Sequence, residues 1–293
     1  MKYINGTLSL FLMTILSQNS LAIENDLQFF SPSNVTLDFD PFTGLPEVKL
    51  AELEFTLPSG EARSVKLTIT PETEPDFEFD SGDVPVQLEI ISDTGTQIVG
   101  QFERVLLLQP GQMNLMEVNF KISAGQYANS GTHQLNLLIN IEDTVSGEQL
   151  LANKPLRIDC VVPSRAQTNF AGAAPSFDNG VGIATLDFGE IVFDDSRQVQ
   201  FQIRGNSDVI VEMSSENSGY MVNQQNADIS PIPYIVDADG VISDMRTPLM
   251  FTRRPEKSLA GSRYPLKVTI KEPEGGAYAG EYRDILSIDV TPR

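Results

Sequence analysis

The sequence predicts an all-β protein built from two β-sandwiches. Almost every segment after residue 34 alternates apolar and polar residues, as strands with one buried face do. Clusters of Gly, Pro, Asp and Asn separate these segments at intervals of roughly 8 to 12 residues, and no stretch of about 10 residues shows a helical period. At roughly 100 to 200 residues per domain, the length of 293 residues favours two domains.

The first 22 residues have the layout of a secretory signal. Lys2 is followed by an apolar run over residues 8–16 and then by the small residues Ser20 and Ala22. The run is too short to span a bilayer, and no later segment approaches the ~20 apolar residues of a membrane helix. We therefore expect residues 1–22 to be a signal peptide cleaved after Ala22, with an uncleaved anchor as the alternative.

Composition excludes several classes of protein. The net charge of −20 produces a surface that repels nucleic acid and anionic lipid. A single cysteine, Cys160, rules out an intrachain disulfide, and together with a single histidine, His133, it rules out the usual triads and His/Cys zinc sites. A carboxylate glycosidase stays open, but the chain has no Trp and no pair of acids in a context that would raise one pKa. We expect no enzyme and no cofactor.

The expected strands follow one another with turns between them. The segment NVTLDF, residues 34–39, should be the first strand of the first sandwich, because it leads directly into further alternating segments. Other strand segments are VKLTI (65–69), VPVQLEI (84–90), VQFQI (199–203) and LKVTI (266–270), and the turn clusters are PSGE (58–61), DTG (93–95), NSG (217–219), DADG (237–240) and EGG (274–276).

The two halves of the chain repeat one pattern. VNFK at 118–121 leads into GTHQLNLLINI, and VTIK at 268–271 leads into AGEYRDILSIDV. With one gap these segments superimpose Gly131 on Gly280, His133 on Tyr282, Leu137 on Leu286, Ile139 on Ile288 and Ile141 on Val290. A coarser similarity joins VKLAELEFTL, from Val48, with ATLDFGEIVF, from Ala184. We expect sandwiches over residues 23–166 and 167–293, divided near a small-residue linker at about 165–177.

The two copies differ on the C-terminal side of the repeated strand. The first copy turns at TVSGE and continues into KPLRIDCVVP, in which Leu156, Ile158, Cys160 and Val162 alternate with other residues. The second copy has no such continuation in this sequence. We expect the first sandwich to be complete and the second to lack its final strand, which leaves a groove that another protein's strand can fill. Closure by an earlier segment is the alternative. The groove would be bordered by Tyr282, Leu286, Ile288 and Val290.

The second copy resembles the spore coat protein U domain of subunits of archaic chaperone-usher pili. The pattern A-G-x-Y-x-D at residues 279–284, an alternating strand and Thr291-Pro292 carry the resemblance, with support from LDFGEI (186–191) and IPYIVDADG (232–240). It covers roughly residues 170–293 and implies immunoglobulin-like, pilin-type sandwiches. The first copy matches poorly, with His133 and Leu135 in place of Tyr and Asp. Family members commonly carry cysteines, which the second copy lacks.

The resemblance also implies partners and a function. A periplasmic chaperone would fill the groove first, and at the outer-membrane usher the N-terminal extension of an adjacent subunit would replace it. In that family an extra, self-complete N-terminal domain looks like a tip adhesin, so we expect a surface pilus subunit that binds an unknown surface or host ligand. The alternatives are an internal or minor subunit, in which residues 34–39 are a free donor strand, and a free periplasmic carbohydrate- or lipid-binding protein.

Three turns of the first copy carry large apolar residues that would bind a ligand if exposed. They are FDPFTGLP with Phe42 and Leu45, DFEFDSGDVP with Phe77 and Phe79, and LLLQPGQMNLM with Leu108, Met113 and Leu115. Each side chain can equally belong to a strand end that points inward.

Other polar residues are expected to have structural roles. Tyr282 and Asp284 should fix a turn and a buried hydrogen bond. Asp237, Asp239 and Asp244 fail the spacing of a calcium loop. Cys160 should be a buried thiol, and His133 should lie in the core or a turn.

Overall fold

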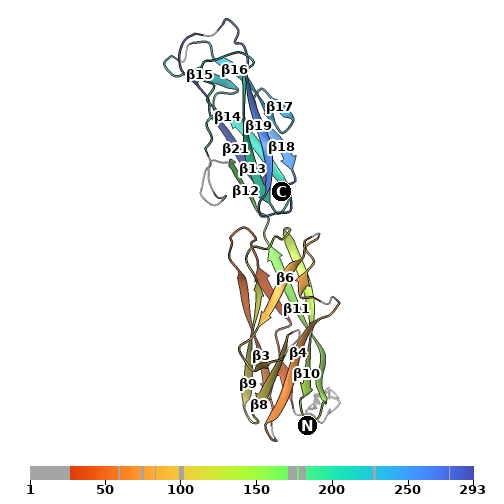
Figure 1. Cartoon of the computed structure of the whole chain (residues 1–293). Helices are drawn as coiled ribbons and strands as arrows, with labels where there is room; N and C mark the ends of the chain where they lie inside the picture. Colours follow the sequence, from red (N-terminus) through yellow and green to blue (C-terminus); the bar gives the residue numbers. More distant parts are fainter. Residues whose placement is uncertain are drawn as a thin grey trace, which may run out of the picture.

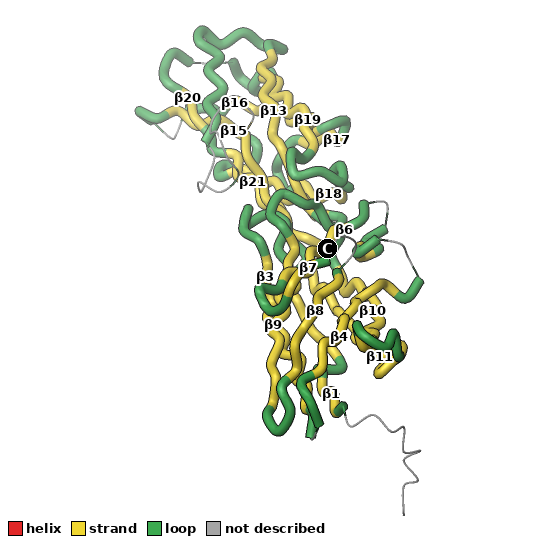
Figure 2. Tube along the Cα trace, turned by 60° about the horizontal axis from the view of Figure 1, so that its bottom comes forward, coloured by secondary structure: helices red, strands yellow, loops and turns green. Residues whose placement is uncertain are grey.

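The computed structural model describes residues 27–58, 60–73, 76–82, 84–98, 102–170, 177, 183–226, 229–276 and 278–293. These residues form strands and loops without a helix (Figure 2), which confirms the predicted all-β class. The described part of the chain therefore has no helix that could cross a membrane. The predicted signal peptide, residues 1–22, lies outside the described residues.

Two sheets enclose the core of the first sandwich. One has the order β1-β3-β9-β6-β5 and the other the order β2-β11-β10-β4-β8-β7. The strands are β1 (Gln28–Phe30), β2 (Asn34–Asp38), β3 (Glu47–Thr56), β4 (Arg63–Pro71), β5 (Glu78–Phe79), β6 (Val86–Ile91), β7 (Thr96–Gln97), β8 (Glu103–Leu108), β9 (Met113–Ile122), β10 (Gly131–Asp143) and β11 (Gln149–Val162).

The second sandwich has a seven-stranded and a three-stranded sheet. The first has the order β12-β13-β19-β16-β15-β20, with β17 beside β16, and the second has the order β18-β14-β21. The strands are β12 (Ala166–Phe170), β13 (Ser196–Gly205), β14 (Val209–Ser215), β15 (Tyr220–Asn223), β16 (Ile232–Ala238), β17 (Val241–Ser243), β18 (Leu249–Arg253), β19 (Ser262–Ile270), β20 (Tyr282–Arg283) and β21 (Leu286–Pro292).

The strand orders of the two sandwiches correspond. The run β1-β3-β9-β6 matches β12-β13-β19-β16, and β10-β4-β8 matches β21-β14-β18. Among the described residues, β2 and β11 have no counterpart in the second sandwich. The coarse repeat predicted from the sequence is wrong, because β13 occupies the place of β3 while residues 184–193 form no strand.

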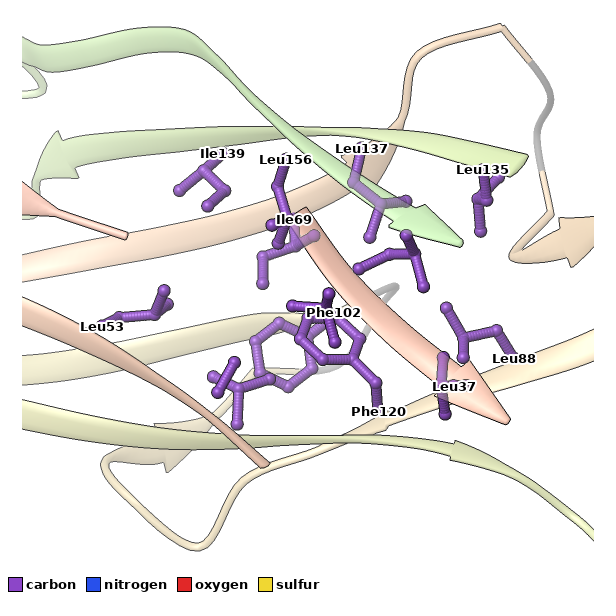
Figure 3. Close-up of a cluster of buried hydrophobic side chains, with 14 of the residues drawn as sticks. Leu37, Leu53, Ile69, Leu88, Phe102, Phe120, Leu135, Leu137, Ile139 and Leu156 are labelled. Carbon is purple, nitrogen blue, oxygen red and sulfur yellow. The ribbon is translucent and has the colours of Figure 1, made fainter. Parts of the chain in front are cut away.

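The core of the first sandwich is closed on the side of β11. Leu135, Leu137 and Ile139 of β10 and Leu156 of β11 point toward Phe120 of the opposite sheet (Figure 3). The inward side chains of β11 are buried, and β2 pairs in parallel with its outer edge. Residues 34–38 are thus built into the first sandwich as the sequence predicts.

The two sandwiches lie end to end, with the C-terminal end of the chain near their junction (Figure 1). Asn206, which is buried, joins them: its side chain accepts a hydrogen bond from Arg165 N (2.8 Å) and donates to Pro163 O (2.9 Å), while its carbonyl accepts from Ser130 N (3.0 Å). The predicted linker at 165–177 is partly wrong, because residues 166–170 form β12 and pair with β13.

Candidate functional site: the open edge of β21

Among the described residues, the strand β21 has a hydrogen-bonded partner strand on one edge only. It pairs in antiparallel fashion with β14, and within the described residues no strand pairs with its other edge. The residues Leu286, Ile288 and Val290 alternate along it toward the core, and we call these three residues the open edge. An edge strand of this kind presents unpaired backbone N–H and C=O groups to any extended chain.

The register of β21 is the same as that of β10. In the first sandwich Leu137, Ile139 and Ile141 face Pro71, Ile69 and Leu67 of β4. In the second, Leu286, Ile288 and Val290 face Ser215, Met213 and Val211 of β14. The residue-by-residue repeat read from the sequence thus holds in the strand pairing.

Burial differs between these matched residues. Leu137, Ile139 and Ile141 are each 0% exposed, whereas the open edge is partly exposed and packs against the second core. In the first sandwich β11 pairs with the other edge of β10, with Leu156 beside Leu137. In the described part of the second sandwich, no strand makes the contact with β21 that β11 makes with β10.

The A-G-x-Y-x-D pattern builds the crossing between the sheets just before the open edge. Gly280 has φ +154°, and a Cβ atom there would lie 2.1 Å from Nδ2 of the buried Asn223, so no larger residue fits without a shift. The hydroxyl of Tyr282 donates to Tyr278 O (3.1 Å). Tyr282 lies in β20, which pairs with β15, so the predicted continuous strand is interrupted before Leu286.

The carboxylate of Asp284 lies at this interruption. It accepts hydrogen bonds from Ser215 Oγ (2.6 Å), from the backbone and side-chain nitrogens of Asn217 (3.0 and 2.9 Å) and from the hydroxyl of Tyr234. Burial, and then the bond to Asp284, raise the pKa of the Tyr234 hydroxyl. The structural role predicted for Asp284 is confirmed. Its partner Tyr234 was missed, because no local pattern links residues 50 positions apart.

The predicted ligand loops divide into buried and exposed side chains. Phe42, Phe79 and Leu108 are buried, so the prediction that they form exposed tips is wrong. Phe42 packs under the guanidinium of Arg204 from the second sandwich, 5.1 Å from its ring centre, and Phe79 and Leu108 are inward residues of β5 and β8. Phe77 packs against the first core, while Leu45, Met113 and Leu115 are 67%, 56% and 46% exposed.

The remaining polar residues have structural partners. Cys160 is buried in β11, as predicted, and burial raises the pKa of its thiol to about 12. The ring of His133 lies beside the carbonyls of Asn129 (2.8 Å) and Asp80 (3.1 Å).

The aspartates of the DADG turn also bond locally. Asp237 accepts from Gly240 N (2.8 Å), and Asp239 pairs with Arg253 (2.9 Å). In the described part of the chain, no group of three or more His, Cys, Asp or Glu side chains is placed to hold a metal ion.

No family model matches the sequence, and no curated protein matches it. Among solved structures, the chain is similar to the CsuC-CsuE chaperone-tip adhesion subunit complex from archaic Csu pili of Acinetobacter baumannii (11% identity, 90% of this chain and 99% of that chain, TM-score 0.45). It is also similar to the CupB6 tip adhesin from Pseudomonas aeruginosa (11%, 90% and 94%, TM-score 0.37). The CssB subunit of Escherichia coli, complemented with a donor strand from CssA, matches 47% of this chain (17%, 98% of that chain, TM-score 0.31). Likenesses of this size concern the course of the strands alone.

Proposed function

We propose that the protein is an adhesive subunit of a surface pilus, assembled when a strand of another protein pairs with the open edge of β21. The observation that carries this proposal is the contrast between β10 and β21, which share one register while only β10 has a closing strand among the described residues. Strand addition supplies main-chain hydrogen bonds and buries alternate side chains, which are the two things that the open edge lacks.

The export route and the order of partners follow from this assembly. An open edge with apolar side chains promotes aggregation, so it needs a cover from the time of folding. A periplasmic chaperone would supply the first strand after export, and at an outer-membrane usher an adjacent subunit would supply the second. The A-G-x-Y-x-D resemblance and the pilus subunits among the similar structures support this order.

The position at the tip is supported by the first sandwich. The strands β1 and β2 are integrated into its two sheets, and Val35 and Leu37 are buried in its core. A subunit inside a shaft needs a free strand to donate, and residues 34–38 are not free in this fold. The internal-subunit alternative requires these residues to leave the core.

The ligand would bind at the end of the first sandwich farthest from the second. The turn between β8 and β9 lies there, opposite the end that carries Phe42 and the junction. A cleft of about 270 Å³ there is lined by four leucines, by Phe55 and Gly95, and by the polar residues Thr94 and Asn114. Leu107 in its lining and Met113 next to Asn114 are exposed. Apolar side chains at this end suit a hydrophobic surface or a lipid-like ligand.

Closing the open edge in cis tests the proposal. Residues 145–162, the turn and strand that close the first sandwich, are added after Arg293, because Asp143 of β10 corresponds in register to Pro292 of β21 and Thr144 therefore corresponds to Arg293. We expect the grafted chain to be monomeric and the unfolding midpoint of its second sandwich to rise, since each newly buried aliphatic side chain contributes about 1.5 to 3 kcal/mol. Light scattering and urea denaturation measure both.

The matched control carries the same graft with Glu at the copies of Leu156 and Ile158. This control adds the same length of chain without apolar side chains for the open edge, so it should behave like the parent protein. Equal stability of the parent, grafted and control chains would overturn the proposal.

A further inference from the structure

The carboxylate of Asp284 is surrounded by hydrogen-bond donors where the chain passes from β20 to β21. One oxygen accepts from Ser215 Oγ (2.6 Å) and from the Tyr234 hydroxyl, and the other accepts from both nitrogens of Asn217 (3.0 and 2.9 Å). Ser215 Oγ in turn accepts from Gly219 N (2.7 Å). Charge-assisted hydrogen bonds of this kind are stronger than neutral ones.

These donors come from both sheets of the second sandwich. Ser215 ends β14 in the three-stranded sheet, and Tyr234 belongs to β16 in the seven-stranded sheet. Tyr234 is 3% exposed, so its hydroxyl lies in the interior between the sheets. Asp284 therefore connects the two sheets directly beside the first residue of the open edge, Leu286.

The first sandwich has an apolar residue at the position that corresponds to Asp284. The residue before Leu137 on the inward face of β10 is Leu135, which is 6% exposed and pairs with Ile158 of β11. There, β10 runs without interruption from Gly131 to Asp143, and it pairs with β11 from Gly131 to Glu142. The second sandwich, whose described residues include no such strand, has the carboxylate of Asp284 at the corresponding place.

We propose that Asp284 is a positioning residue that ties the two sheets together and holds the start of β21 in place while the open edge is uncovered. This inference rests on the proposed function, since it assigns the bridge to the state before another strand arrives. The hydrogen bonds to Asp284 should therefore stabilise β21 strongly while the open edge is uncovered, and only weakly once another strand is paired with it.

Hydrogen exchange of the full chain tests the first half of this proposal. Tyr234→Phe removes one donor of the bridge and keeps the ring. We expect the amides of residues 286–291 to exchange about tenfold faster or more in this variant. Tyr127→Phe is the matched control, because it removes a buried hydroxyl that donates to Gly205 O (3.1 Å) at the junction, far from the bridge. Equal exchange of residues 286–291 in the two variants would overturn the proposal.

The same pair of variants in the grafted chain separates this inference from the proposed function. If the graft covers the open edge, Tyr234→Phe should change the exchange of residues 286–291 less than about threefold there. A graft that protects β21 while the effect of Tyr234→Phe stays undiminished contradicts the bridge's conditional role. A graft that protects nothing contradicts the proposed function and leaves the roughly tenfold effect in the ungrafted chain as the separate test of the bridge.

Discussion

The side chains of Leu137, Ile139 and Ile141 are fully buried, while those of Leu286, Ile288 and Val290 are partly exposed, although both sets have the same register on a matching neighbour strand. The difference in exposure follows from what lies next to β10 and β21 in their sheets. In the first sandwich β11 and β2 extend the sheet beyond β10, and among the described residues nothing extends it beyond β21. Burial at these positions is therefore decided by a neighbouring strand and not by the residues themselves.

The comparison also shows that two kinds of interaction can fix the same position of a β-sandwich, here Leu135 in the first and Asp284 in the second. Leu135 is held by apolar contact under a closing strand, and Asp284 is held by hydrogen bonds from both sheets. Before a partner strand binds, that strand contributes nothing to the stability of the open sandwich. A bridge made within the domain provides stability that does not depend on the partner.

The largest expected effect is a difference in lost unfolding free energy between two Ile→Ala variants at matched positions of β10 and β21. Ile139→Ala should cost about 3 kcal/mol of unfolding free energy, because it leaves a cavity in a closed core, and Ile288→Ala about 1 kcal/mol, because its site is partly solvated. Urea denaturation read by hydrogen exchange of each sandwich separately measures both. Equal costs would mean that Ile288 is already covered.

A smaller difference is expected between the two equivalent glycines. Gly131 has φ +135°, and a Cβ atom added there would have its nearest neighbouring atom 3.9 Å away, while a Cβ atom added at Gly280 would lie 2.1 Å from Asn223 Nδ2. Gly280→Ala should therefore destabilise its sandwich by about 1 kcal/mol more than Gly131→Ala destabilises the first. Similar melting shifts for the two variants would contradict the account of the A-G-x-Y-x-D pattern.

The smallest expected effect is a loss of stability in alkali. The pKa of Tyr234 is raised in the folded state, so the unfolded chain releases this proton first as pH rises. Its contribution is complete below its ordinary pKa near 10 and decreases above it. Stability measured between about pH 9 and 11 should fall less steeply in Tyr234→Phe than in the parent. Tyr264 is the control, because its pKa is raised mainly by burial and not by a hydrogen bond to a carboxylate. The fall of stability with pH should therefore change less in Tyr264→Phe than in Tyr234→Phe.

Much of this architecture could be predicted from the sequence, because a strand with one buried face alternates apolar and polar residues. The repeat of β9 and β10 in β19 and β21 was readable residue by residue, since aliphatic residues recur at fixed spacing. The failures have physical reasons. Residues 184–193 alternate without pairing, and Phe42, Phe79 and Leu108 are apolar residues near turns whose direction depends on contacts with distant residues. The bond between Tyr234 and Asp284 depends on how two sheets face each other.

The central claim is that the open edge of β21 is a vacant place for a strand, and thiol accessibility tests it most directly. Cys160, in the closing strand of the first sandwich, is the chain's single cysteine and is buried with a raised pKa, so it should react slowly with a maleimide in the folded protein. A Cys160→Ala, Ile288→Cys variant places the single thiol on the open edge instead.

This second thiol should react at least about a hundredfold faster than Cys160, and adding the closing strand after Arg293, with Ala at the copy of Cys160, should slow it to a comparable rate. A thiol at position 288 that reacts as slowly as Cys160 without the added strand would contradict the account.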